Sequence, residues 1–188
     1  MTIVKELDVL RSERQTAPYF FMNDITPSQV TQLIEYSNDL NDTAIQSYTS
    51  DTGDTGRFRS LDAYNKWRVQ GKSVYTLVDA ADNLRGIIWI ASKAPPDDFQ
   101  YFEVLDKNVY KLTTGIRLYK EARRSGLAPD FYQRAFQHFF ANMGGEISNS
   151  PRLWGNANRH NSALLNTIAR VGFRQVSYPL NNRVIVAR

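Results

Sequence analysis

The stretch RRSGLA, residues 123–128, combines residue types that are suited to bind a phosphate group. It lies between an expected strand that ends near Tyr119 and an expected helix. The first N–H groups of a helix have no partner inside the helix and carry partial positive charge, so they can donate to a phosphate. Glycine lets a ligand approach the backbone closely, and arginines add charge-assisted contacts. Alone, the stretch is more typical of a solvated turn with incidental arginines, because short motifs recur by chance.

A second motif lies in NSALLNTIARVGF, residues 161–173. Asn161 opens an expected helix, and the pair Gly172-Phe173 ends it eleven and twelve residues later. The order and separation of the two motifs resemble those of the GNAT superfamily of N-acyltransferases. Members of this superfamily carry Arg/Gln-x-x-Gly-x-Gly/Ala after a central strand, and they carry the Asn and Gly-Phe pattern around a later helix. The resemblance covers about residues 19–188.

The resemblance implies a cofactor site for acetyl-CoA as cosubstrate, with no metal. The pantetheine arm would pair with the strand backbone within residues 115–119, the pyrophosphate would lie on the N–H groups of residues 124–128, and Asn161 would touch the arm. The implied cofactor-binding residues are Ile116, Leu118, Arg123, Arg124, Ser125, Gly126, Leu127, Ala128 and Asn161.

The chain departs from the family at the residue that supplies a general acid. Many members have a tyrosine seven residues after the Asn, and here that position is Ile168, which has no proton to donate. Tyr119, Tyr178, His160 and Ser162 are the alternative donors. Glu103 is the candidate base, because it interrupts an aromatic, strand-like run; a solvated surface group is the competing interpretation. The predicted catalytic residues are therefore Glu103 and Tyr119.

The implied activity is transfer of an acetyl group from acetyl-CoA to a primary amine, by direct attack in a ternary complex. The partners would be acetyl-CoA and an amine acceptor, and dimers are common in families of this kind. A second hypothesis is a non-catalytic acyl-CoA-binding or regulatory module, suggested by Ile168. A nucleic-acid-binding module is suggested only by the net charge of +4, and the lysines and arginines form no run or stripe.

The fold class implied is α/β (α+β): a twisted, mixed, mostly antiparallel sheet of about six to seven strands, splayed centrally, with helices on both faces. The patterns predict strands at 19–22, 73–79, 85–92, 99–106, 109–120 and 152–157, and a terminal hairpin across Asn181-Asn182. They predict helices at 27–37, 61–67, from about 128 to 142, and 161–172. Residues 38–60 are expected to form a long polar loop that frames the acceptor.

Composition bounds the remaining possibilities. The chain has 188 residues, which is consistent with one domain over 1–188, with 1–18 as an N-terminal extension. It contains no cysteine, which excludes disulfides, thiolate-ligated zinc and a cysteine nucleophile. No histidine or carboxylate group has metal-ligand spacing. We find no signal-peptide core and no apolar run of membrane-spanning length, so we expect a cytoplasmic protein without a membrane partner.

Overall fold

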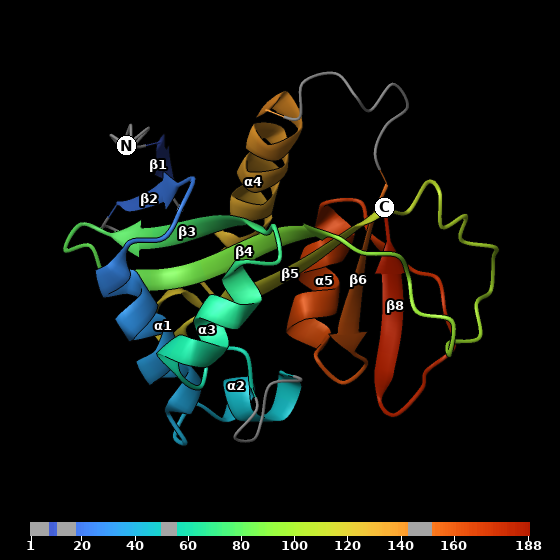
Figure 1. Ribbon diagram of the computed structural model, residues 1–188, viewed down its shortest axis with the longest axis horizontal. Helices are drawn as coiled ribbons and strands as arrows, with labels where there is room; N and C mark the ends of the chain where they lie inside the picture. Colours follow the sequence, from blue (N-terminus) through green and yellow to red (C-terminus); the bar gives the residue numbers. More distant parts are fainter. Residues whose placement is uncertain (1–7, 11–17, 50–55, 143–151) are drawn as a thin grey trace.

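The computed structural model describes residues 8–10, 18–49, 56–142 and 152–188. Eight strands in this part of the chain form one sheet, in the order β1-β2-β3-β4-β5-β6-β8-β7 (Figure 1). The strands are β1 Asp8–Leu10, β2 Tyr19–Met22, β3 Ser73–Asp79, β4 Leu84–Ser92, β5 Leu112–Leu118, β6 Leu153–Asn158, β7 Arg174–Gln175 and β8 Arg183–Ala187. The sheet is open and mostly antiparallel, as predicted, with one or two strands more than expected; β1 lies in the stretch predicted as an extension and pairs with β2.

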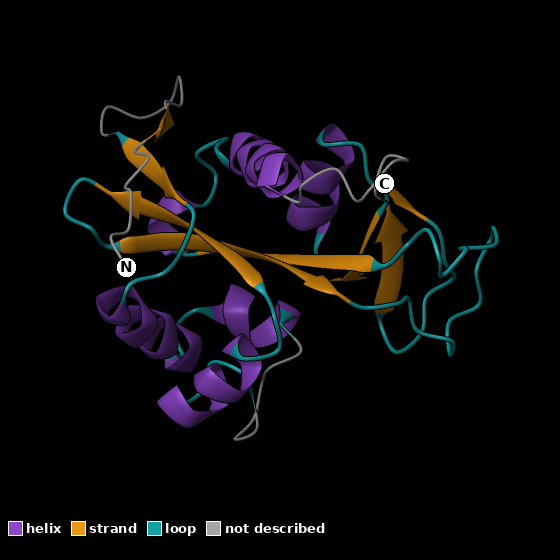
Figure 2. Cartoon of the chain, turned by 45° about the horizontal axis from the view of Figure 1, so that its top comes forward, coloured by secondary structure: helices purple, strands orange, loops and turns teal. Residues whose placement is uncertain are grey.

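The helices lie on both faces of this sheet, which confirms the predicted layers (Figure 2). They are α1 Pro27–Asn38, α2 Thr43–Tyr48, α3 Leu61–Arg68, the 3-10 helix η1 Lys120–Ala122, α4 Ala128–Asn142 and α5 Ser162–Arg170. Helices α1 and α3 cover one face, where Leu33, Phe58, Trp67 and Ile87 share a core. Helices α4 and α5 cover the other face through a second core that includes Phe131 and Phe173.

Local signals explain several element boundaries. The Thr26 side chain accepts from the N–H of Gln29, and the Gln29 side chain accepts from the N–H of Thr26, so the two residues form a capping box at the start of α1. Asn181 and Asn182 both have positive φ, 47° and 60°, between mutual hydrogen bonds of Leu180 and Arg183. That is the tight turn predicted for the terminal hairpin.

Two predicted elements are wrong. Residues 99–106 form no strand: they belong to the loop between β4 and β5, in which Tyr101 makes only an isolated bridge to Ser177. Residues 38–60 are not loop throughout, because α2 forms within them with Asp42 as its N-cap. Residues 50–55 of that stretch, and most of the loop predicted after α4, lie outside the described residues.

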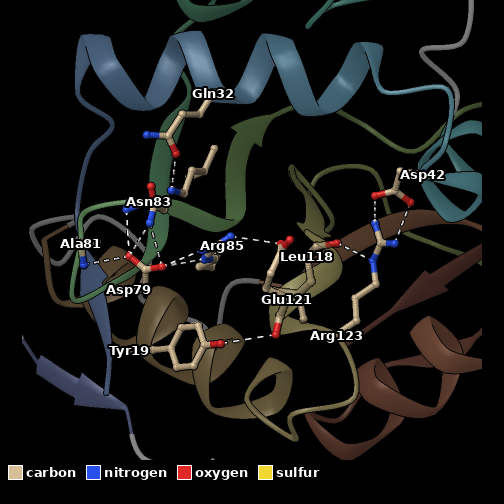
Figure 3. A network of polar contacts seen from close by, with 11 residues as sticks. Tyr19, Gln32, Asp42, Asp79, Ala81, Asn83, Arg85, Leu118, Glu121 and Arg123 are labelled. Atoms are coloured by element: carbon tan, nitrogen blue, oxygen red, sulfur yellow. Dashed lines mark hydrogen bonds and ion pairs between the residues drawn. The ribbon is translucent and has the colours of Figure 1, made fainter. Parts of the chain in front are cut away.

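A polar network joins elements that are distant in the sequence (Figure 3). At one end, the guanidinium of Arg85 bridges Asp79, at 2.7 Å, and Glu121, at 3.1 Å. At the other end, Arg123 Nη1 and Nη2 donate to the two carboxylate oxygens of Asp42, both at 2.7 Å, and its Nε donates to the carbonyl of Leu118, also at 2.7 Å. The hydrogen bonds of Arg123 to Asp42 thus connect the N-terminus of α2 to the segment that follows β5.

This buried ion pair should make stability depend on acid pH. Burial alone would raise the pKa of Asp42, but hydrogen bonds from Arg123 and from backbone N–H groups outweigh burial and lower it. Because the pKa of Asp42 is lower in the folded than in the unfolded state, its ionised carboxylate stabilises the fold. This stabilisation is complete at pH values above the unfolded-state pKa of about 4, and it is lost as the pH falls through the folded-state pKa.

We therefore expect Asp42→Asn, which keeps an N-cap acceptor, to lower the free energy of unfolding by about 1–3 kcal/mol at pH 7. Its loss relative to the native chain should shrink as the pH falls below about 4. Urea denaturation at several pH values measures both effects. Asp97→Asn is the control, because Asp97 pairs with Lys107 at the surface and should cost less than about 0.5 kcal/mol. Equal losses in the two variants would contradict the role of the Arg123–Asp42 pair.

Candidate functional site

The parallel pairing of β5 with β6 stops after two residue pairs. Leu112 pairs with Leu153 and Thr113 with Trp154, and no further pairing of the two strands occurs within the described chain. Strand β5 continues along β4 to Leu118, while β6 continues along β8 to Asn158. The two strands therefore diverge and leave a gap in the middle of the sheet, where the sequence predicted a splay.

The backbone of β5 offers hydrogen-bonding groups to this gap. The N–H of Tyr119, next to the end of β5, donates to the carbonyl of Arg85 in β4 at 2.9 Å. Along a strand, the N–H and C=O groups of successive residues point alternately to the two sides. The N–H and C=O groups of Thr114, Ile116 and Leu118 therefore point away from β4. A Cβ built on Gly155 of β6 would lie 3.3 Å from the Thr114 carbonyl oxygen, which places that oxygen in the gap. The predicted residues Ile116 and Leu118 thus lie on the open edge.

Two cavities share residues at the gap, and the smaller is lined from both faces of the sheet, because Trp89 packs with the core under α1 and α3 and Ile168 lies in the core under α4 and α5. The larger, of about 940 Å³, lies beside α3 and will be called the α3 cavity; the smaller, of about 100 Å³, reaches α5 and will be called the α5 cavity. Of the described residues, six line both cavities. Two of them, Trp89 and Gly115, lie against each other, because a Cβ built on Gly115 would lie 2.2 Å from the Trp89 ring. The other shared residues are Arg57, Thr114, Asn156 and Arg183.

The predicted phosphate loop follows the open strand. Arg124 and Gly126 have positive φ, 61° and 83°, and the Ser125 hydroxyl donates to the carbonyl of Ala122 at 2.6 Å. The N–H of Leu127 donates to Ser125 Oγ at 3.3 Å. Among the described residues, the N–H groups of Arg124 and Gly126 have no partner. Alternating left-handed residues turn N–H groups toward a common point, which is how backbone binds anions.

The two arginines of this loop differ in their surroundings. The Arg123 side chain is held by Asp42 and Leu118, so it supports the loop rather than extending toward a ligand. Arg124 is exposed. Ala128 begins α4, so the predicted loop and the helix N-terminus are continuous.

Asn161 is the N-cap of α5. Its side chain accepts from the N–H of Leu164 at 3.0 Å, and it lines neither cavity. Ile168, at the position of the missing tyrosine, lines the α5 cavity together with Tyr132 and Phe173.

The structure does not bring the two predicted catalytic residues to the cavities. Glu103 lies on the loop between β4 and β5 and pairs with Arg174 of β7, at 2.9 Å. Tyr119 is fully buried between α1 and the sheet, where its ring contacts Tyr36, and burial raises the pKa of its hydroxyl to about 12. That hydroxyl has no hydrogen-bond partner among the described residues. Neither residue lines either cavity.

Sequence reasoning missed Tyr48 and Arg57. Both line the α5 cavity, and Arg57 also lies over the Trp89 ring, with 5.4 Å between the guanidinium carbon and the ring centroid. Tyr48 ends α2, a helix that the sequence did not predict. No local pattern marks these residues, because they reach the site only through the packing of α2 and the following segment. In the described part of the chain, no group of His, Asp or Glu could hold a metal ion.

A helix that could cross a membrane is not found among the described residues. No protein-family model matches the chain, and no curated protein matches it either. Solved structures do match. The GNAT domain of S. lividans PAT is 8% identical, with 97% of this chain and 96% of that one covered and a TM-score of 0.69. The ribosomal-protein-S5-alanine acetyltransferase from Vibrio fischeri is 12% identical, with 96% of each chain covered and a TM-score of 0.59.

A chimera of the spermidine N-acetyltransferase SpeG from Vibrio cholerae with hSSAT is 14% identical, with 90% of this chain and 93% of that one covered and a TM-score of 0.59. Likeness at these identities is likeness of fold. The chain therefore has the fold of the GNAT acetyltransferases.

Proposed function

We propose that this protein is an acetyl-CoA-dependent N-acetyltransferase in which a primary amine attacks the thioester directly. The observation that supports the proposal most strongly is the gap between β5 and β6, because the α5 cavity there is lined by residues from both faces of the sheet and shares residues with the α3 cavity. Two substrates that enter from opposite faces meet there without a covalent intermediate on the protein. Holding both in line supplies much of the acceleration.

The acyl donor fits the side of the loop and α5. The N–H groups of Arg124 and Gly126 would hold the pyrophosphate, and the backbone of Ile116 and the N–H of Leu118 would pair with the pantetheine arm, since the Leu118 carbonyl already accepts from Arg123. One wall of the α5 cavity is apolar, formed by Leu164, Ile168 and Phe173, which suits a thioester and its alkyl arm.

The chemical step forms one bond and breaks another. The neutral amine nitrogen bonds to the thioester carbonyl carbon, the C–S bond breaks, and the amine loses one proton while the thiolate gains one. A backbone N–H at the open edge of β5, such as that of Ile116, can stabilise the oxyanion. Among the described residues, two phenols, Tyr48 and Tyr132, line the same cavity as Ile168. Tyr132 is buried, and burial raises the pKa of its hydroxyl, so we assign to Tyr48 the proton donated to the thiolate.

The non-catalytic alternative rests on a specific feature. Among the described residues that line the α5 cavity there is no carboxylate, and the family's usual tyrosine is replaced by Ile168. Thiol release from acetyl-CoA with a panel of amines distinguishes the two functions. Binding of acetyl-CoA without turnover of any amine would favour a binding module.

The loop assignment is tested at Gly126. Gly126→Asp places a carboxylate against the pyrophosphate site, and we expect acetyl-CoA affinity to fall by at least a hundredfold in isothermal titration calorimetry. Gly126→Asn is the matched control, because it has nearly the same size and the same strain at positive φ but no charge. Its loss should be distinctly smaller. Equal affinities of the Asp variant and the native chain would show that the pyrophosphate lies elsewhere.

The role of Tyr48 is tested by removing one oxygen atom. We expect Tyr48→Phe to lower kcat by tenfold or more, because proton donation contributes about a hundredfold or more in typical enzymes, while the Kd of acetyl-CoA stays within twofold. Tyr178→Phe is the control, because Tyr178 is an exposed phenol outside both cavities. An unchanged kcat in Tyr48→Phe would mean that this hydroxyl does not protonate the thiolate.

A further inference from the structure

The α3 cavity carries an excess of positive charge. Its lining includes five cationic side chains and two carboxylates among the described residues. The cations are Arg57, Lys66, Lys72, Lys93 and Arg183, and the carboxylates are Asp62 and Asp98. They come from separate parts of the chain: α3 and the turn after it, the end of β4, the segment before α3, and β8.

The three lysines are not neutralised inside the described structure. No carboxylate of the described residues forms an ion pair with Lys66, Lys72 or Lys93. Lys72 Nζ instead donates to the carbonyl of Trp67 at 2.9 Å and to Gln70 Oε1 at 2.6 Å. A cavity with uncompensated cations attracts an anionic ligand and repels a cationic one.

The charges around Lys72 are also mostly positive. Burial lowers the pKa of Lys72, and the nearby charges of Arg57, Lys93 and Arg68 lower it further. Three positive charges near Lys72 mean that a further positive charge is disfavoured at this position. A ligand with several ammonium groups would meet the same repulsion.

The shape of the cavity adds an aromatic wall. Trp67 and Trp89 meet edge to face, with ring centroids 5.9 Å apart, and Phe99 and Trp154 also line the space. Trp89 lies at the junction with the α5 cavity, while Lys66 and Lys93 are exposed. At about 940 Å³, the volume is near the upper end of small-molecule sites, which span roughly 300–1,000 Å³.

We propose that the acceptor is an amine that carries one or more acidic groups, carboxylate or phosphate. Its amino group lies at the gap beside Trp89 and Gly115, and its acidic groups lie against Lys66, Lys72 and Lys93. This inference rests on the proposed function, because it names the class of the amine that enters the α3 cavity. Polyamines are excluded from the site by the same charges.

The test measures the binding of acetyl-CoA to the native protein, and the binding of three probes to that protein with and without an excess of coenzyme A. The probes are aspartyl-glutamate and asparaginyl-glutamine, both with an amidated carboxyl end, and spermidine. The two dipeptides have nearly the same shape and differ in two negative charges. We expect the acidic dipeptide to bind at least tenfold more tightly than the neutral one, with spermidine weakest, and the preference to shrink in 0.5 M salt.

Charge reversal locates the preference in the α3 cavity. In the double variant Lys66→Glu with Lys93→Glu, the preference for the acidic dipeptide should disappear. Arg170→Glu is the control, because Arg170 is exposed on α5 and lines neither cavity, and it should leave the preference within twofold. A preference that survives in the double variant, or equal binding of both dipeptides to the native protein, overturns the inference.

The same titrations separate this inference from the proposed function. If acetyl-CoA binds and the acidic dipeptide has no advantage, the acceptor class is wrong and the acetyltransferase proposal stands. If the acidic dipeptide is preferred and acetyl-CoA does not bind to the native protein, the proposed function is wrong, and the α3 cavity remains an anion-selective site.

Discussion

The site depends on the early end of the pairing between β5 and β6. Each strand is fixed on its outer side, β5 by seven residue pairs with β4 and β6 by five with β8, so neither can move to close the gap. The backbone groups left open lie in the interior of the sheet, where an unsatisfied polar group costs about 1–3 kcal/mol. Water or a ligand must satisfy them, and a pantetheine arm offers amides at suitable intervals.

The ion pair of Arg123 with Asp42 holds the end of this gap in shape. Arg123 stands inside the motif that resembles a phosphate loop, yet its three hydrogen bonds go to Asp42 and Leu118. The arginine therefore sets the position of the loop relative to β5 and α2. A loop whose shape is set before the ligand arrives loses less conformational entropy on binding, which favours affinity. The same pair brings α2, and with it Tyr48, toward the α5 cavity.

Local sequence was sufficient to predict most of the helices and strands and the turn at residues 123–128. The capping box at Thr26, the Asn181-Asn182 turn and the 123–128 loop are each specified by neighbouring residues. The strand expected at 99–106 failed because its apolar residues serve another purpose: Phe99 and Leu105 pack with Trp154 and Val176 in a small core under the loop. Within the described chain, no neighbouring strand pairs with residues 99–106 beyond one isolated bridge, and an alternating pattern of residue types does not by itself show whether a pairing strand exists.

The lining of the α3 cavity could not be predicted from the sequence, because its residues come together only in the folded structure. Lys66, Lys93 and Arg183 lie on three elements, and nothing near each of them in sequence indicates a shared cavity. The catalytic assignment to Glu103 depended on the same failed strand. Tyr119 was assigned from its position near the loop, whereas the alternation of β5 directs its side chain into the core beside α1.

The two halves of the site also fit each other electrostatically. The loop lies at the carboxyl end of β5, while Lys93 lies beside its amino end, where the N–H of Lys93 donates to Lys111. The seven residues of β5 span about 20 Å at the usual rise of a strand. That separation exceeds the Debye length of about 8–10 Å in physiological salt. The proposed acidic acceptor and the pyrophosphate of the donor could therefore both bind without repelling each other, and Arg57 and Arg183, which line both cavities near Gly115, place positive charge where the two ligands would meet.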